Sequence, residues 1–193
     1  MTAPHVSERL CEADFDLLDA PEYLFTDLWG NGVPDRTRLK LAHDGDTLYF
    51  LFRSEFEGVL PEKYKKKSGK VFRADATEIF VCFDGNTSRY YELDLSPFNR
   101  AFFAVIENPD DQNLSLARIG RDVAVTATRM CDGYYDTLYA LPISRFSPSG
   151  NPDILFNAYR VRVIDGKRTS RALCPTQAVS HHVRESFVKL LLK

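Results

Sequence analysis

Residues 38–52 read RLKLAHDGDTLYFLF, two short apolar segments joined by a turn that contains Asp44 and Gly45. The first segment alternates polar and apolar side chains, and the second is rich in aromatic and aliphatic ones, as β-strands are. An Asp-Gly pair between such segments is a strong hairpin signal, because glycine tolerates the positive φ that the turn requires. The stretch therefore predicts two neighbouring antiparallel strands.

A second pair follows the same plan. A predicted strand over residues 76–83 ends at the turn Asp84-Gly85-Asn86. Residues 89–95, RYYELDL, are predicted to form the strand that pairs with it. Successive side chains of a strand point to opposite faces. The alternation predicts that Tyr91, Leu93 and Leu95 face the core, that Tyr90, Glu92 and Asp94 face the other way, and that Glu78 shares a face with Phe80.

Further segments of strand character recur along the chain, so that about ten strands are expected. They are residues 101–106, 123–129, 134–141, 155–164 and 187–192. Sheets of this size usually divide into two packed layers, which predicts an all-β, antiparallel, two-sheet β-sandwich of the immunoglobulin or jelly-roll kind. Because no linker or repeat interrupts the pattern, residues 1–193 are expected to form a single domain. The cationic stretch 61–70 is expected to be a solvated loop. The segment that carries Trp29 is expected to pack onto the sandwich, with Trp29 as a structural residue rather than a binding platform.

Composition argues against several classes of partner. With 193 residues and a formal net charge of -2, the chain has no basic footprint for nucleic acid or for an anionic membrane surface. No apolar run approaches the length of a membrane span, and residues 1–10 lack an export signal. These features predict no membrane association and a cytoplasmic location for the chain as given, or an extracellular one if a signal has been removed.

No cofactor is expected from the metal-binding residue types. The four cysteines contain no C-x-x-C pair, there are four histidines, and no EF-hand pattern is present. Calcium at turn aspartates stays an open alternative at this stage, the candidates being Asp44, Asp46, Asp84, Asp110 and Asp111.

Glu78 is the most informative polar residue, because it enters a largely apolar strand. Two interpretations remain open for it: an ion pair with an arginine, or contact with a ligand. Arg160 and Arg162 are candidates for pairing with Glu78 or Glu92 across a sheet, and also for ligand contact.

Six short motifs in a fixed order resemble the family 9 carbohydrate-binding modules and their DOMON-type sugar-binding relatives. They cover nearly the whole chain: residues 41–49, residues 75–80, residues 90–93, residues 141–143, residues 156–160, and residues 175–187. The resemblance implies a β-sandwich that holds a sugar in a slot between two aromatic side chains, with polar side chains bonded to its hydroxyl groups. Apolar C–H patches of a pyranose ring suit an aromatic face, and its hydroxyls suit carboxylates and amides.

The same resemblance assigns positions in the slot. Phe72 stands where the first clamp tryptophan lies, six residues before Glu78, and His181 or His182 stands in the region of the second clamp. Departures from the pattern leave the identity of the sugar open. The implied ligand-binding set is Phe72, Glu78, Glu92, Asn157, Tyr159, Arg160, His181 and His182.

These features predict non-catalytic carbohydrate binding, with an oligosaccharide or polysaccharide as partner and carbohydrate catabolism as the setting. No turnover is expected. One alternative is a glycoside hydrolase, or a protein associated with one, with Glu78 and either Glu92 or Asp94 as its carboxyl pair. Another is a haem-binding electron-transfer domain, for which the chain offers Met1, Met130 and the histidines. A third is an interaction module whose sugar slot has decayed.

Overall fold

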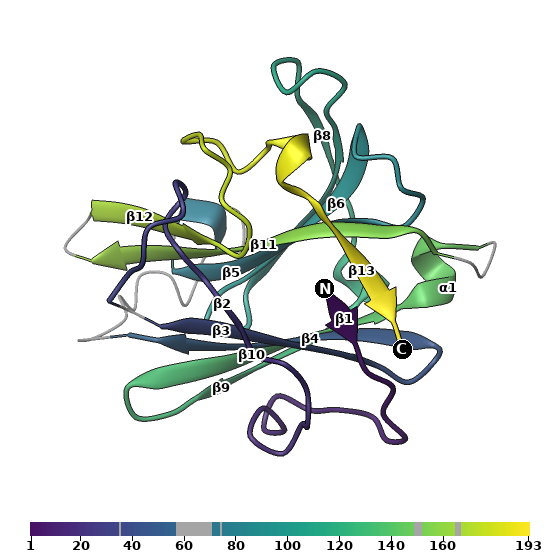
Figure 1. Cartoon of the computed structure of the whole chain (residues 1–193), viewed down its shortest axis with the longest axis vertical. Helices are drawn as coiled ribbons and strands as arrows, with labels where there is room; N and C mark the ends of the chain where they lie inside the picture. Colours follow the sequence, from purple (N-terminus) through teal and green to yellow (C-terminus); the bar gives the residue numbers. More distant parts are fainter. Residues whose placement is uncertain (35, 57–70, 74, 149–151, 165–166) are drawn as a thin grey trace.

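A computed structural model describes residues 1–34, 36–56, 71–73, 75–148, 152–164 and 167–193, apart from the side chains of Phe72 and Ile164. The described residues form two sheets that lie face to face (Figure 1). The expected β-sandwich is therefore confirmed. The stretch 61–70, predicted to be a solvated loop, lies outside the described residues.

The larger sheet has eight strands, and its pairing is antiparallel except between its first two members. In spatial order it contains β1 (Thr2–Ala3), β13 (Val188–Leu192), β11 (Ile154–Ile164), β5 (Ala76–Cys82), β6 (Arg89–Leu95), β7 (Ala101–Glu107) and β8 (Ser115–Arg118), and β12 (Lys167–Ala172) pairs with β11.

The smaller sheet has five antiparallel strands. In spatial order they are β2 (Tyr23–Leu24), β3 (Thr37–His43), β4 (Thr47–Glu55), β10 (Tyr134–Pro142) and β9 (Val125–Met130). Four single-turn helices complete the described elements: η2 (Val71–Arg73), η3 (Arg121–Val123), α1 (Ile143–Phe146) and η4 (Arg184–Ser186). In the described part of the chain, no helix has the length and apolar character that a transmembrane span requires.

Both predicted hairpins are confirmed. Strands β3 and β4 pair antiparallel across a turn in which Gly45 has φ +96°, and β5 and β6 pair across a turn in which Gly85 has φ +71°. The structure has 13 strands among its described residues rather than about ten. Four of them fall outside the expected segments because they are very short or carry few apolar residues: β1, β2, β8 and β12.

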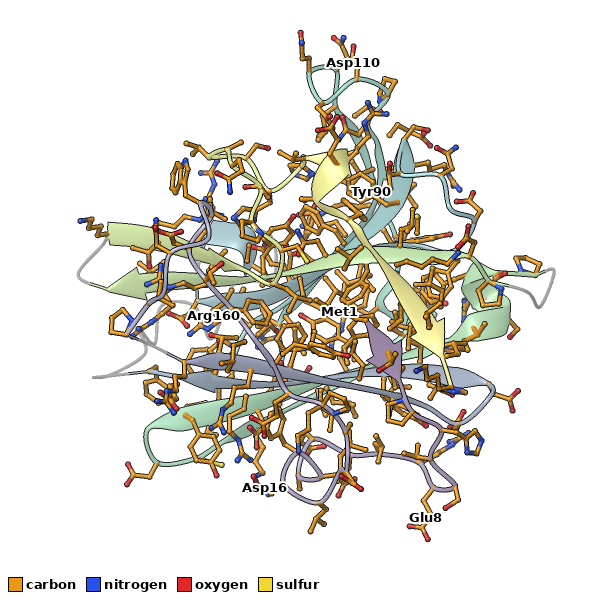
Figure 2. The ribbon with its side chains drawn as sticks, in the orientation of Figure 1. Met1, Glu8, Asp16, Tyr90, Asp110 and Arg160 are labelled. Carbon is orange, nitrogen blue, oxygen red and sulfur yellow. The ribbon has the colours of Figure 1, made fainter. Side chains whose placement is uncertain are left out.

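Three apolar layers stack through the molecule. The first lies between the sheets and contains Leu93 and Leu95, as predicted. The second covers the outer face of the larger sheet and contains Phe80 and Tyr90, under the segment between β12 and β13 (residues 173–187), which carries Phe187. The third, on the outer face of the smaller sheet, lies under residues 6–20. Figure 2 shows Tyr90 on the outer side of the larger sheet and Asp16 beyond the smaller one.

Candidate ligand-binding site

A pocket of about 290 Å³ opens on the outer face of the larger sheet. Strands β5, β6 and β7 form its floor, and the segment 173–187 forms one wall. Figure 1 shows this segment, in yellow-green and yellow, on the outer side of that sheet. The lining residues are Glu78, Phe80, Glu92, Phe102, Leu116, Arg168, Val179, Ser180, His181 and His182.

Asn157 fixes the wall to the sheet. This side chain is fully buried on β11, and its Nδ2 donates to the carbonyl oxygen of Cys174 at 2.8 Å and to Oγ of Ser186 at 3.0 Å. Its Oδ1 accepts from the backbone N–H of Cys174 at 3.0 Å. Both ends of the wall are thus tied to one side chain, which limits where the two histidines between them can lie.

His181 is held on two sides. Its ring stacks on Tyr159 with centroids 4.4 Å apart and an interplanar angle of 3°, and the Tyr159 hydroxyl donates to the His181 carbonyl oxygen at 2.8 Å. Nδ1 of His181 donates to Oε2 of Glu78 at 2.8 Å. This bond fixes the ring orientation and leaves Nε2 as the free ring nitrogen.

His182 lies flat over the pocket floor. Its ring stacks on Phe80 with centroids 4.9 Å apart, and its Nδ1 lies 2.8 Å from the Tyr90 hydroxyl. Burial lowers the pKa of His182 to about 4, and the neighbouring His181 adds to the effect. The ring is therefore neutral near pH 7 and presents an aromatic surface rather than a charge.

Three carboxyl groups are buried together beneath the histidines. Glu78, Glu92 and Asp94 are 1%, 5% and 0% exposed, and Glu78 is in register with Asp94 on the neighbouring strand. Burial, and then the negative charge of Glu78, raise the pKa of Glu92 to about 8. Burial, and then the nearby carboxyl groups of Glu78 and Glu92, hold the pKa of Asp94 well above its usual range. At neutral pH the cluster therefore carries protons as well as negative charge.

Two buried polar atoms of this cluster have no hydrogen-bond partner among the described residues: Oε1 of Glu78 and Nε2 of His181. Glu92 and Asp94 share a side-chain hydrogen bond with each other. Buried polar atoms are nearly always paired in folded proteins, since leaving one unpaired costs about 1–3 kcal/mol. The unpartnered atoms of Glu78 and His181 both belong to residues that line the pocket, which makes it the candidate site for a polar ligand.

The raised pKa of Glu92 predicts a pH dependence of stability. Between the unfolded value of 4.5 and the folded value of about 8, the folded chain keeps a proton that the unfolded chain has lost. This contribution to the free energy of unfolding is full below the lower value and is lost as pH rises through the upper one. Because Glu92→Gln removes it, the wild type should lose more stability than the variant between pH 5 and pH 8, by on the order of 3 kcal/mol.

Urea unfolding at both pH values measures the difference. The matched control is Glu107→Gln, which changes an exposed glutamate on the adjacent strand β7 and should leave the pH dependence as it is in the wild type. Equal losses in the wild type and Glu92→Gln would contradict the prediction.

The predicted site residues fall into four groups. Glu78, Glu92, His181 and His182 line the pocket, whereas Asn157 and Tyr159 lie behind its wall, where they hold the histidines. Arg160 does not reach the pocket: it lies between the two sheets (Figure 2), forms an ion pair with Asp75, and stands 5.0 Å from the Tyr135 ring centroid. The backbone of Phe72 lies in η2, and its side chain is outside the described structure.

Other lining residues were missed by the sequence interpretation. Phe80 had a usable signal, because it follows Glu78 by two residues and pairs with Glu92 in register. Phe102 comes from β7, next in the sheet, and follows by the same cross-strand logic once the sheet order is known. Arg168 had no usable signal in the sequence, since it lies in β12, which reads KRTSRA and lacks a strand pattern.

The other candidate chemistries find less support in the geometry. No group of three or more histidine, cysteine, aspartate or glutamate side chains is placed to hold a metal ion, as far as the described residues extend. Met130 lies at the exposed edge of the smaller sheet, away from His181 and His182, which stand on the far side of the larger one.

Comparisons with known proteins bear on the fold. No family model and no curated protein matches the chain. Among solved structures, a "putative carbohydrate-binding protein" from Bacteroides uniformis superposes with a TM-score of 0.77 at 15% identity, covering 100% of this chain and 98% of that one.

Two structures of a family 9 carbohydrate-binding module from Caldicellulosiruptor kristjanssonii are also similar. The complex with glucose gives a TM-score of 0.72 at 13% identity, and covers 100% of this chain and 95% of that chain. The complex with cellotriose gives 0.69 at 12% identity, with coverage of 100% and 93%. The resemblance seen in the sequence is thus confirmed for the fold: the chain has the fold of the family 9 modules.

Proposed function

We propose that the protein binds carbohydrate in the pocket over β5, β6 and β7 and leaves it chemically unchanged. The observation that carries the proposal is the group of buried polar side chains that line the pocket beside aromatic rings, Glu78, Glu92 and His181, of which Glu78 and His181 each have an unpartnered polar atom. A sugar presents both complements at once, because its hydroxyl groups donate and accept hydrogen bonds while its ring C–H groups are apolar.

Each part of the site has a role in this proposal. Ionised carboxylate oxygens accept from sugar hydroxyls, and a protonated Glu92 also donates to them. The rings of Phe80 and His182, stacked on each other, and the ring of Phe102 supply apolar contact. Asn157 and Tyr159 act as positioning residues for His181. Phe72 remains a proposed clamp residue, by its resemblance to the family motif.

The structural neighbours support the choice of ligand class. One is described as a carbohydrate-binding protein, and the family 9 module was solved with glucose and with cellotriose. We therefore propose a glucose unit, alone or in a β-glucan oligosaccharide, as the first ligand to test, with service in carbohydrate catabolism as the biological setting.

Glu78→Gln should weaken sugar binding by about 10- to 100-fold, the range expected for losing a hydrogen bond to a charged group. The substitution keeps the size of the side chain but removes the charge that orients His181. Calorimetric titration with glucose, cellotriose and xylo-oligosaccharides measures it, with Glu107→Gln as the matched control that should bind like the wild type. Unchanged affinity in Glu78→Gln would remove the pocket from the proposal.

A hydrolytic activity is the second candidate, favoured by one observation. A carboxyl group with a raised pKa, Glu92, shares the pocket with a second carboxyl group, Glu78, and glycoside hydrolysis uses an acid and a second carboxylate in this way. Sustained release of reducing sugar from β-glucan or xylan by the pure protein, lost in Glu78→Gln, would establish turnover. We expect binding without release.

A further inference from the structure

A second pocket, of about 340 Å³, adjoins the first on the same side of the larger sheet. The two share Arg168 and Val179 as a common boundary. The remaining lining comes from the loop after β2 and from β12: Asp27, Leu28, Trp29, Thr169, Ser170 and Arg171. Each pocket is near the lower end of the range of about 300–1,000 Å³ for small-molecule sites, so a longer ligand would need both.

Trp29 is the large aromatic residue of this second pocket, and it is 52% exposed. The segment around it packs onto the sandwich as expected, with Phe25 and Leu28 buried, but the indole itself is half-exposed. Tryptophan is highly buried on average, and an exposed indole at a pocket offers a flat apolar surface of the kind that a sugar ring covers. Val179, on the boundary of both pockets, is also strongly exposed at 79%.

The loop that carries Trp29 is well fixed. Oδ1 of Asp27 accepts from the backbone N–H groups of Trp29 at 2.9 Å and of Asn31 at 2.8 Å. Nδ2 of Asn31 donates to the other oxygen of the same carboxylate at 2.9 Å. The asparagine bonds lower the pKa of Asp27, so that the carboxylate stays ionised and keeps accepting.

This loop is also tied to the wall of the first pocket. The backbone N–H of Gln177 donates to the Leu28 carbonyl oxygen at 2.9 Å, and Nε2 of Gln177 donates to the Trp29 carbonyl oxygen at 3.2 Å. Gln177 belongs to the segment 173–187 that carries His181 and His182. The two pockets thus have a fixed relative position before any ligand arrives, which reduces the entropy cost of binding across both.

We propose that the ligand is an oligosaccharide of at least two sugar units, with one unit in the first pocket and the next against the indole of Trp29. This inference rests on the proposed function, because it names the length of the ligand that the same site takes. The two pockets meet at Arg168 and Val179, so the linkage between the units would cross these two side chains.

Trp29→Ala should weaken binding of cellotriose by about tenfold, the value expected when a stacked aromatic contact is lost, while glucose affinity stays within about twofold. Trp29→Tyr keeps an aromatic face and should retain most of the cellotriose affinity. Calorimetric titration of the wild type and both variants with glucose and cellotriose measures these effects, and unchanged melting temperatures verify the fold, since the side chain is half-exposed.

The outcomes separate this inference from the proposed function. The second subsite is wrong if the wild type binds cellotriose no more tightly than glucose, or if Trp29→Ala binds cellotriose as tightly as the wild type. In either case, the first pocket is still supported if Glu78→Gln loses sugar binding. If the wild type binds neither sugar, the proposed function fails and the inference fails with it.

Discussion

Asp136→Ala is expected to lower the free energy of unfolding by about 3–5 kcal/mol, because it leaves the buried guanidinium of Arg53 without its main counter-charge. Arg53 and Asp136 face each other in register on β4 and β10, and two bonds of 2.8 and 2.9 Å join Nε and Nη2 to the two carboxylate oxygens. Both residues are buried, at 5% and 1% exposed. The bond to Asp136 is the main cause that raises the pKa of Arg53. The substitution removes this cause, but an arginine side chain stays protonated in proteins in any case, so the variant keeps an uncompensated buried charge.

Rings on both sides of the guanidinium restrict any relaxation. Arg53 lies 4.6 Å from the Phe15 ring centroid and 4.4 Å from that of Tyr134, so the arginine also fixes residues 6–20 to the outer face of the smaller sheet. Thermal unfolding should show a fall in Tm of about 6–20 °C for Asp136→Ala.

Asp16→Ala is the matched control for the same arginine. Asp16 bonds Nη1 of Arg53 at 2.6 Å, but its side chain is 66% exposed, and exposed ion pairs contribute at most about 1 kcal/mol. Its Tm should stay within about 4 °C of the wild type. Equal Tm values for the two variants would show that burial of the Asp136 bond does not set its contribution. Sugar binding at the opposite sheet should be unchanged in both.

The sequence predicted the sandwich because local signals and tertiary pairing agree along most of the chain. In the hairpin over residues 38–52 and in the pair 76–95, strand alternation and turn glycines both specify the observed register. The short strands β1, β2, β8 and β12 were not predicted, because pairing with neighbouring strands, rather than their own composition, makes them strands.

The residues of the candidate site also differ in how far a local sequence pattern marks them. Glu78, Glu92 and the histidine pair line the pocket, and a polar residue in an apolar strand, or a motif in the right order, marks each of them within one segment. Arg160 lies between the sheets instead, since its alternation with Tyr159 specifies opposite faces but not which face carries the pocket. Trp29 and Arg168 join the surface only through loop and strand contacts that no local pattern encodes.

The last large effect concerns the wall that carries the histidines. The Asn157 side chain forms hydrogen bonds with the backbone N–H and the carbonyl oxygen of Cys174, and with the side-chain hydroxyl of Ser186. Its Nδ2 also donates to the Tyr159 hydroxyl at 2.9 Å. One buried side chain thereby joins β11 to both ends of the segment 173–187, and Asn157 itself is not a lining residue of the pocket.

Asn157→Ala is expected to lower the free energy of unfolding by about 3 kcal/mol, because it leaves several buried partners unpaired at about 1–3 kcal/mol each. Glucose affinity, measured at a temperature where both proteins are folded, should fall at least about tenfold as His181 and His182 lose their fixed positions. Asn113→Ala, which removes an exposed asparagine bond to Asp110, should change neither quantity. A destabilised Asn157→Ala with wild-type glucose affinity would show that the histidines do not depend on this anchor, and that the sheet-borne carboxyl groups alone hold the sugar.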